Sequence, residues 1–239
     1  MTKGEKISVI IPCWNNAATI KRAIDSCLAQ TLLPLEILVC DDSSTDKTKA
    51  IVKSIRSPLV SWLGGKNHSA RPAVPRNRGI KKARGDWLAF LDADDEWLPK
   101  KLEKQIKTAK KTECLAICSN AYRKTKGGNR RTLYFDFPDK RLKLSNLLIT
   151  NFVICSSMLL HHSLLKKTGS FPQDKKLVSV EDYALWLRVA SESDIVYLEK
   201  PLVIYNDQPA TSIRSKVNRN PLLAKIRALR DFIHWAQKE

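Results

Sequence analysis

The sequence predicts an α/β fold in which a parallel sheet carries helices on both faces. Short apolar runs of strand length alternate with segments whose apolar residues recur at helical spacing, and this alternation is typical of parallel strands joined by crossover helices. Several apolar runs end abruptly in acidic residues. The 239 residues are enough to bury a substantial core. We therefore expect one large domain in residues 1–210 and a helical tail in residues 211–239.

The first hundred residues alternate strand and helix. Residues 7–11 are an apolar run that predicts a buried strand ending at Pro12, because proline cannot donate to a sheet. Apolar residues at helical spacing follow in residues 17–30. The same alternation then predicts strands at 35–40, 59–63 and 86–91, a helix ending at residue 56 and a basic helix at 76–84.

The remaining residues continue with less regular spacing. The expected helices span 100–111, 144–150, 163–168 and 180–190, and the expected strands span 114–119, 153–160, 195–198 and 202–205. Residues 124–131 contain two glycines among basic residues and predict a polar hairpin tip or loop. From Pro221 the chain is expected to be helical, with apolar residues on one face and Lys225, Arg227 and Arg230 on the other.

Charge and cysteine content limit the class of protein. The net charge is +18, and residues 101–239 contribute 26 basic and 13 acidic side chains. Such a field attracts phosphates, nucleic acid or an anionic membrane surface. No apolar run is long enough to cross a bilayer, and the first residues lack the pattern of a signal peptide. Six cysteines without zinc-type spacing favour the reducing cytosol.

Three turns with polar or acidic residues follow expected strands, at residues 12–15, 41–42 and 92–95. Right-handed crossovers place the carboxyl ends of parallel strands at one edge, where open α/β sheets bind ligands. Asp92, Asp94 and Asp95 lie within four residues, and a divalent cation such as Mg²⁺ or Mn²⁺ would relieve their mutual repulsion. An acidic turn that caps the next helix is the simpler alternative for one cluster. Three converging turns favour a shared ligand site.

Five motifs occur in order along the chain: VIIPCWN at 9–15, VCDDSSTD at 39–46, RNRGI at 76–80, LDADD at 91–95 and EDYALWLR at 181–188. Their order and spacing resemble those of the inverting nucleotide-sugar transferases of glycosyltransferase family 2, over residues 7–206. The resemblance implies the A-type glycosyltransferase fold, a Rossmann-like mixed sheet with helices on both faces. It also implies a hexosyl- or N-acetylhexosaminyl-transferase.

The resemblance assigns a nucleotide pocket. Its residues would be Pro12, Trp14, Asn15, Asp41, Asp42, Arg71, Arg76, Asp92 and Ala93. Asp42, or else Asp41, would accept a hydrogen bond from the edge of the base, and Arg76 or Arg71 would contact the diphosphate. Uridine is the base that the family most often uses.

The resemblance also assigns a metal site and a general base. Asp94 would bind Mn²⁺ or Mg²⁺, and Asp92 would hold the ribose or complete the metal shell. Asp182 would be the general base, with its neighbour Glu181 as the other candidate. The chemistry independently requires two acidic sites, because the leaving phosphates gain negative charge while the attacking hydroxyl loses a proton. Acids that merely favour a helix N-terminus are the alternative for Glu181 and Asp182.

The expected reaction moves one sugar from a nucleotide donor to a surface-glycan or lipid-linked acceptor, in the cytoplasm or at the inner face of the membrane. The cationic tail helix supports association with an anionic membrane, although the same helix can instead pack on the domain. A nucleic-acid-binding protein is a second candidate, but no recognised module is present and acidic clusters would repel phosphate backbones. A sugar nucleotidyltransferase would carry a glycine-rich loop after the first strand, and residues 12–16 contain no glycine.

Overall fold

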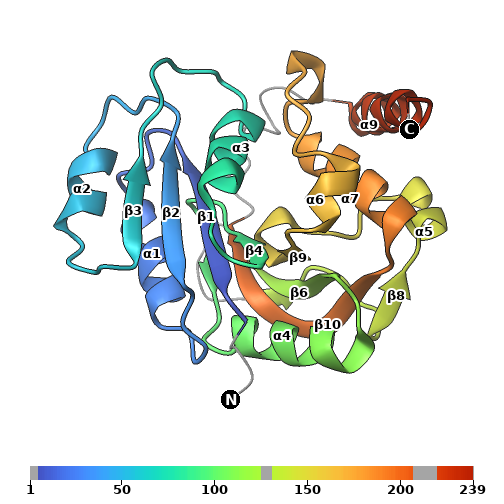
Figure 1. Cartoon of the computed structure of the whole chain (residues 1–239), viewed down its shortest axis with the longest axis horizontal. Helices are drawn as coiled ribbons and strands as arrows, with labels where there is room; N and C mark the ends of the chain where they lie inside the picture. Colours follow the sequence, from blue (N-terminus) through green and yellow to red (C-terminus); the bar gives the residue numbers. More distant parts are fainter. Residues whose placement is uncertain (1–4, 125–130, 207–219, 239) are drawn as a thin grey trace.

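A computed structural model of the chain describes residues 5–124, 131–206 and 220–238, and within these residues the strands form one sheet of ten (Figure 1). The main path runs β3-β2-β1-β4-β9-β6-β10-β5, with β7 paired to β6 and β8 paired to β10. The strands are β1 (Ile7–Cys13), β2 (Glu36–Asp41), β3 (Val60–Leu63), β4 (Trp87–Phe90), β5 (Glu96–Trp97), β6 (Ala116–Lys124), β7 (Arg131–Leu133), β8 (Lys140–Leu142), β9 (Leu159–His161) and β10 (Ile195–Asn206).

The first four strands of the path are parallel, and the rest make the sheet mixed. β9 is antiparallel to both β4 and β6, whereas β6 and β10 run parallel. In the parallel part Cys13 lies opposite Asp41, and Ile10 lies opposite Phe90. The turns that follow β1, β2 and β4 therefore leave the sheet at the same edge, as predicted.

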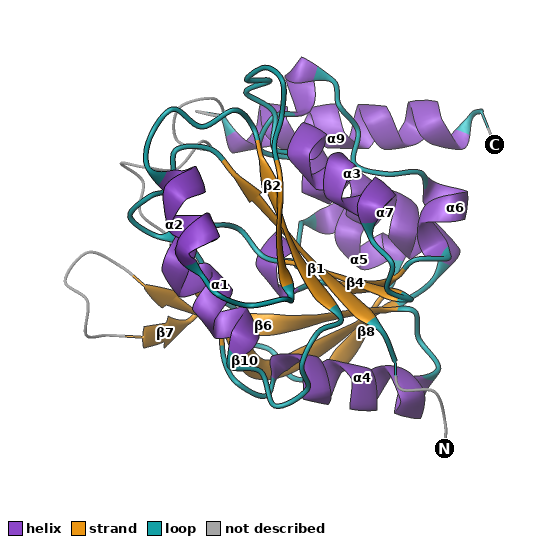
Figure 2. Ribbon diagram, turned by 60° about the vertical axis from the view of Figure 1, so that its left-hand side comes forward, coloured by secondary structure: helices purple, strands orange, loops and turns teal. Residues whose placement is uncertain are grey.

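Helices cover both faces of the sheet (Figure 2). Alternate residues of a strand point to opposite faces, so Val9 and Ile11 enter one core cluster and Ile10 enters the other. The first cluster is covered by α1 (Ile20–Leu28), α2 (Thr48–Ser54) and α4 (Lys101–Thr112). The other is covered by α3 (Ala73–Lys82), α5 (Leu144–Ile149), α6 (Leu164–Thr168), α7 (Glu181–Glu192) and α9 (Pro221–Ala236).

The prediction that Pro12 ends the first strand is wrong, because β1 continues to Cys13 with Pro12 opposite Cys40. The Ile10 carbonyl accepts a hydrogen bond from Leu91 on the β4 side of the strand. Pro12 is two residues further on and therefore faces the same side. β4 has already ended at Phe90, so the missing N–H of Pro12 costs no ladder hydrogen bond.

The run at residues 153–160 was also expected to be one strand, and most of it is not. Cys155–Ser157 form a 3₁₀ turn, η1, and only Leu159–His161 form β9. The two short strands expected at 195–198 and 202–205 are instead one strand, β10, whose register shifts between Leu198 and Val203. The hairpin expected at 124–131 has its strands paired, with Lys124 opposite Arg131. Residues 125–130 between them lie outside the described residues.

The tail helix α9 packs beside α7 (Figure 1). Ala224 and Ala228 are buried in this contact, and Arg188 of α7 forms a 2.5 Å ion pair with Asp231 of α9. The sequence left membrane association and packing on the domain as alternatives for this helix. In the structure, one face of α9 packs on the domain. None of the helices among the described residues is both long and apolar enough to span a bilayer.

Lys101, the first residue of α4, has a fully buried side-chain amine. Its Nζ donates to Gln105 Oε1 at 2.8 Å and lies 4.0 Å from the centroid of the Trp97 ring. Burial lowers the pKa of this lysine to about 7, and the nearby Cys27 and Cys118 oppose the shift. The unfolded chain, in which a lysine has a pKa near ~10.4, therefore binds more protons than the folded chain between these two values.

We expect the free energy of unfolding to rise by about 1.6 kcal/mol between pH 7 and pH 8.5, because deprotonation of Lys101 removes the penalty of a buried charge. Lys101→Met should flatten this rise, whereas Lys107→Met, at an exposed position of the same helix, should keep it. Urea unfolding at several pH values measures the slopes. Parallel slopes for the wild type and Lys101→Met would show that the buried amine does not titrate in this range.

Candidate active site

Arg76 of α3 joins two acidic regions that are far apart in the sequence. Its Nη2 donates to Asp92 Oδ1 at 2.6 Å, and its Nη1 donates to Glu181 Oε1 at 2.6 Å. The Arg76 side chain is only 5% exposed. Asp92 follows β4 and Glu181 begins α7, so the structure brings the two predicted acidic sites to one place.

Close packing of α3 fixes the position of this arginine. A Cβ added to Gly79 would lie 2.7 Å from Cys40 Sγ and 2.8 Å from Ile10 Cγ2, so only glycine lets the helix approach the sheet so closely. Asn77 donates from Nδ2 to the Phe171 carbonyl and accepts from the Phe171 N–H. These bonds tie α3 to the segment that leads into α7, which sets the distance from Arg76 to Glu181.

Asp182 stands in the first turn of α7, next to Glu181. Burial raises the pKa of the Asp182 carboxyl to about 7, the negative charge of Glu181 adds to the shift, and Arg76 opposes it. A carboxyl group with a pKa near the working pH is well suited to take up and release a proton. Asp182 therefore has the chemical character of a general base.

Asp94 lies two residues beyond Asp92, in the turn after β4. Burial raises the pKa of the Asp94 carboxyl to about 6, and the charge of Asp92 contributes to the shift. The Asp94 carbonyl accepts a hydrogen bond from Arg22 Nη2 at 3.0 Å, which anchors the turn to α1. The two carboxylates of the predicted metal motif thus repel each other in the ligand-free protein.

Asp95, the third acid of the turn, holds the turn in place through hydrogen bonds. It is buried, with Ser156 Oγ donating to Oδ2 and the Asn206 N–H donating to Oδ1. Burial and the neighbouring Asp94 and Asp92 raise its pKa well above the usual range. The Asp92 N–H in turn donates to Ser156 Oγ at 3.0 Å. Asp95 and Ser156 therefore hold the acidic turn against η1 and the end of β10.

Asp92 and Asp94 fit the expected divalent cation. Carboxylate oxygens are the hard ligands that Mg²⁺ and Mn²⁺ prefer, and a cation would remove the repulsion that raises the pKa of Asp94. Within residues 5–124, 131–206 and 220–238, no three histidine, cysteine or acidic side chains are grouped as a metal cage. Phosphate oxygens of a bound ligand could complete the shell of a cation at this turn.

The Asp42 carboxylate, expected to meet a nucleobase, accepts three hydrogen bonds within the protein and has His68 as a fourth polar neighbour. Ser69 Oγ donates to Oδ1, while the Ser69 N–H, the Ala70 N–H and His68 Nδ1 approach Oδ2 within 3.1 Å. Asp42 is 3% exposed. It thus holds the loop between β3 and α3 against the end of β2.

Asp41 and Asn15 connect the turns that follow β1 and β2. The Asp41 carboxylate accepts hydrogen bonds from the Ser44 N–H and hydroxyl. Asn15 adopts a left-handed backbone conformation, with φ 52°. Its Oδ1 accepts from the Thr45 N–H at 2.8 Å, and its own N–H donates to Ser44 Oγ. These bonds make the two turns one rigid wall of the predicted nucleotide pocket.

Trp14 projects from this wall and is 46% exposed. Its ring stacks on the ring of His68, with centroids 4.2 Å apart and an interplanar angle of 17°. Pro12 and Ala93, two other predicted pocket residues, are buried. They support the pocket from within the fold, and Trp14 offers an aromatic surface.

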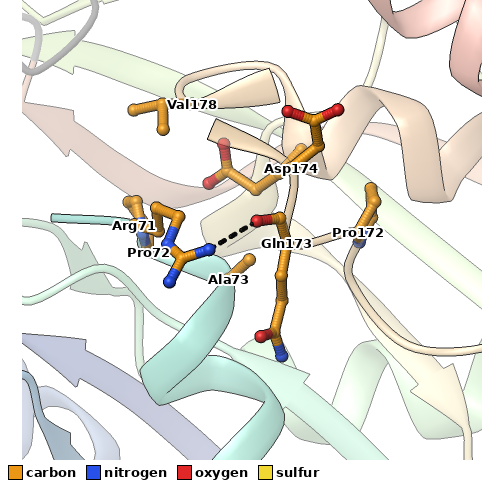
Figure 3. Close-up of a pocket in the computed structure, with 8 residues that line it drawn as sticks. Arg71, Pro72, Ala73, Pro172, Gln173, Asp174 and Val178 are labelled. Atoms are coloured by element: carbon orange, nitrogen blue, oxygen red, sulfur yellow. Dashed lines mark hydrogen bonds between the residues drawn. The ribbon is translucent and has the colours of Figure 1, made fainter. Parts of the chain in front are cut away.

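Arg71 lies just before α3, and its side chain points toward Gln173 (Figure 3). Its Nη1 donates to the Gln173 carbonyl at 2.8 Å. The residues that line the cleft in this figure are Arg71, Pro72, Ala73, Pro172, Gln173, Asp174, Val178 and Glu181. Arg71 therefore helps to close a cleft beside Glu181, while its backbone N–H donates to Ser69 Oγ, which in turn donates to Asp42.

The ion pairs of Arg76 and the contacts of His68 and Ser156 were missed by the reasoning from sequence. Arg76 was expected to contact a diphosphate, which stays a prediction, and the structure pairs it with both acids. His68 lies in a segment without a regular pattern, and Ser156 lies in the apolar run that was expected to be a strand. The one available signal was the position of His68 shortly before the RNRGI motif. The fold and the acidic residues gathered at one sheet edge agree with the class that the motifs resemble, the glycosyltransferases of the A-type fold that use a nucleotide sugar.

The chain belongs to glycosyltransferase family 2. The family model described as "Glycosyl transferase family 2" matches residues 8–169, which is more than half of the chain. This finding confirms the resemblance inferred from the five motifs and establishes the chain as a transferase.

Relatives agree with this assignment. The UDP-Glc:alpha-D-GlcNAc-diphosphoundecaprenol beta-1,3-glucosyltransferase WfaP of Escherichia coli is 34% identical over 188 residues, which cover 79% of this chain and 71% of that protein. A glycosyltransferase of Rickettsia typhi is 30% identical over 224 residues, covering 91% of this chain and 69% of that one. The crystal structure of residues 1–349 of TarS from Staphylococcus aureus, in complex with UDP-GlcNAc, has a TM-score of 0.73 at 22% identity. It covers 98% of this chain and 73% of TarS 1–349, and it shows the same fold.

Proposed function

We propose that this enzyme transfers one sugar, with inversion, from a UDP-sugar to a hydroxyl of a lipid-linked glycan intermediate. The arrangement that carries the proposal is the pair of ion pairs from Arg76 to Asp92 and Glu181, because it places a donor-binding turn beside a base on α7. The names of WfaP and TarS supply the choice of donor and acceptor: one uses UDP-Glc and acts on a diphosphoundecaprenol-linked sugar, and the other binds UDP-GlcNAc.

The base in this reaction is Asp182. Its carboxylate takes the proton of the acceptor hydroxyl while that oxygen forms a bond to the anomeric carbon of the donor sugar. The bond from this carbon to the nucleoside diphosphate breaks on the opposite side, so the anomeric centre inverts. Glu181 is less suited to this role because Arg76 already occupies its Oε1. Glu181 and Arg76 instead position the start of α7 relative to Asp92.

Asp94 and Asp92 are the residues that would hold a divalent cation, with the phosphates of the donor as its other ligands. Such a cation stabilises the negative charge that develops on the leaving diphosphate. Trp14 would stack on the base, and the Arg76 guanidinium adds a second positive charge near Asp92.

Asp94→Asn is expected to abolish the metal-dependent part of donor binding. UDP with Mn²⁺ at about 100 times its dissociation constant should stabilise the wild type by about 2.7 kcal/mol, and the variant should respond to UDP equally with and without Mn²⁺. A thermal-shift panel of UDP, GDP and dTDP sugars with Mn²⁺ or EDTA measures this. Asp25→Asn, on the exposed face of α1, is the control. An Asp94→Asn variant that keeps the full Mn²⁺ response would place the cation elsewhere.

The acceptor can be tested directly. Purified enzyme, labelled UDP-glucose or UDP-GlcNAc and a short-chain lipid diphosphate carrying one sugar should give one labelled product of a single added residue. Hydrolysis of the UDP-sugar without any labelled lipid product would contradict the proposed acceptor and leave the proposed donor class intact.

An exposed apolar surface suggests how the enzyme meets a lipid-linked substrate. Its residues, called here the α5–α9 surface, are Leu148, Ile149, Leu222, Leu223 and Ile233. The two helices are joined where Lys225 Nζ donates to the Ile149 carbonyl at 2.5 Å. Arg227 and Arg230 lie on the same helix, so the surface combines apolar and cationic groups, as interfacial helices do. We assign it to an anionic bilayer.

The triple variant Leu222→Ser, Leu223→Ser, Ile233→Ser should lower binding to vesicles that contain phosphatidylglycerol by about tenfold or more, because buried apolar area drives such binding. Leu33→Ser is the control, since Leu33 is 59% exposed but lies between α1 and β2. Vesicle flotation measures the bound fraction. Equal flotation of both variants and the wild type would remove the α5–α9 surface from the proposal.

The proposed place of action is the cytoplasmic face of that membrane. All six cysteines are buried and unpaired, as expected in a reducing compartment. No observation on the described residues favours the two alternatives from the sequence, nucleic-acid binding and nucleotidyl transfer. The positive net charge suits an anionic membrane surface and phosphate-bearing substrates.

A further inference from the structure

His68 makes two contacts that a nucleobase is expected to make in the same pocket. Its imidazole stacks on Trp14 at a centroid distance of 4.2 Å. Its Nδ1 lies 2.9 Å from Asp42 Oδ2. A base in the proposed donor site would likewise stack on an aromatic face and donate a ring N–H to the carboxylate.

The Asp42 carboxylate has no capacity for both. An ionised carboxylate offers about four lone-pair positions, and Ser69 Oγ, the Ser69 N–H and the Ala70 N–H take three of them. His68 Nδ1 is the fourth polar group, 2.9 Å from Oδ2 and 3.1 Å from the Asp42 carbonyl oxygen. The base N–H would be a fifth. Two of the four groups are backbone groups fixed by the loop. His68 is 37% exposed in its side chain and can leave by rotation about its side-chain bonds, so it is the group most easily given up.

We propose that His68 occupies the place of the nucleobase in the free enzyme and is displaced when the donor binds. This inference rests on the proposed function, since it requires Trp14 and Asp42 to receive the base. The exchange lowers donor affinity, because the free enzyme must give up the contacts of His68 before the base can bind. The vacated space is that of a single ring between Trp14 and Asp42, which suits a pyrimidine base.

Removal of the imidazole should therefore strengthen donor binding. His68→Ala is expected to bind UDP with Mn²⁺ about tenfold more tightly than the wild type by isothermal titration calorimetry, a gain of about 1.4 kcal/mol. His162→Ala, which removes a histidine that follows β9, should leave the affinity unchanged. Thermal unfolding of the ligand-free variants checks that each is folded.

The displacement can also be followed in the unaltered protein. The chain has four histidines, so their Cε1–H signals are few enough to resolve by NMR, and the signal that is missing in His68→Ala identifies His68. Ring current from Trp14 should shift this signal in the free enzyme, and saturating UDP with Mn²⁺ should move it to the position of an exposed histidine.

The outcomes separate the inference from the function on which it rests. Weaker or equal UDP binding by His68→Ala, or a His68 signal that keeps its shifted position with UDP bound, overturns the displacement while leaving sugar transfer intact. If neither the wild type nor His68→Ala binds any nucleoside diphosphate, both the proposed function and the inference fail. Tighter binding together with the moving signal establishes His68 as a competitor of the base.

Discussion

Asp182→Asn is expected to lower kcat by about 10²–10⁴-fold, the usual contribution of a general base, with UDP affinity within about twofold of the wild type. Asparagine has nearly the same shape as aspartate and cannot accept a proton. Burial, and then the charge of Glu181, raise the pKa of Asp182 to about 7, which suits a group that takes a proton near neutral pH. The residues proposed to bind the donor lie on other elements, so donor binding should be retained.

The pH dependence gives a second measurement of the same role. Only the deprotonated Asp182 can act as the base, so kcat of the wild type should rise about tenfold per pH unit below pH 7 and level off above it. Glu192→Gln, at the other end of α7, is the matched control and should keep both kcat and its profile. Turnover that survives in Asp182→Asn would transfer the role to Glu181, which Glu181→Gln would then test.

The edge of the sheet that carries the site was predictable because it follows from strand direction. Buried strands cannot hold charge, so acids that end apolar runs mark the carboxyl ends, and parallel strands bring those ends together. The positions of Asp41 and Asp92 follow from this reasoning, and Cys13 opposite Asp41 confirms the register. The helix that begins at Glu181 was likewise predictable from its apolar spacing.

The partners of the arginines were not predictable, because helical spacing does not determine which long side chain turns inward. Arg71, Arg76 and Arg78 all lie in or beside α3. Arg78 donates to the backbone carbonyl of Asp41 and Arg71 to that of Gln173. Only Arg76 meets carboxylates. Its neighbour Asn77 binds Phe171 through bonds across 94 residues of sequence, and no local pattern reports such a contact.

The mixed sheet was implied by the family resemblance, whereas the apolar pattern by itself did not report which strands are antiparallel. An apolar run buried on both faces looks the same whether its neighbours run parallel or antiparallel, so residues 153–160 appeared to be one strand. In the η1 turn, Ser156 Oγ donates a hydrogen bond to Asp95 and accepts one from the Asp92 N–H. In β10 the register shift follows Leu198, near Pro201, a residue that favours such irregularities in a strand.

Arg76→Met is expected to destabilise the protein by about 3–5 kcal/mol, the cost of removing one partner from a buried ion pair. Asp92 and Glu181 would both lose the same cation, and the Arg76 side chain is only 5% exposed. Arg84→Met is the matched control, because Arg84 also pairs with a glutamate, Glu36, but is 71% exposed. Exposed pairs contribute about 0–1 kcal/mol, so urea unfolding should separate the two variants clearly.

Relieving the unpaired charges should recover part of this loss. Arg76→Met combined with Glu181→Gln is expected to be more stable than Arg76→Met alone, because a neutral amide tolerates burial better than an unpaired carboxylate. The loss of Arg76 should also act on Asp182, since its charge opposes the raised pKa of that carboxyl. The acid limb of kcat in folded Arg76→Lys should therefore stay near pH 7, whereas in Arg76→Met it should move to higher pH. Unfolding free energies and pH profiles that match the Arg84→Met control would show that Arg76 neither stabilises the acids nor adjusts the base.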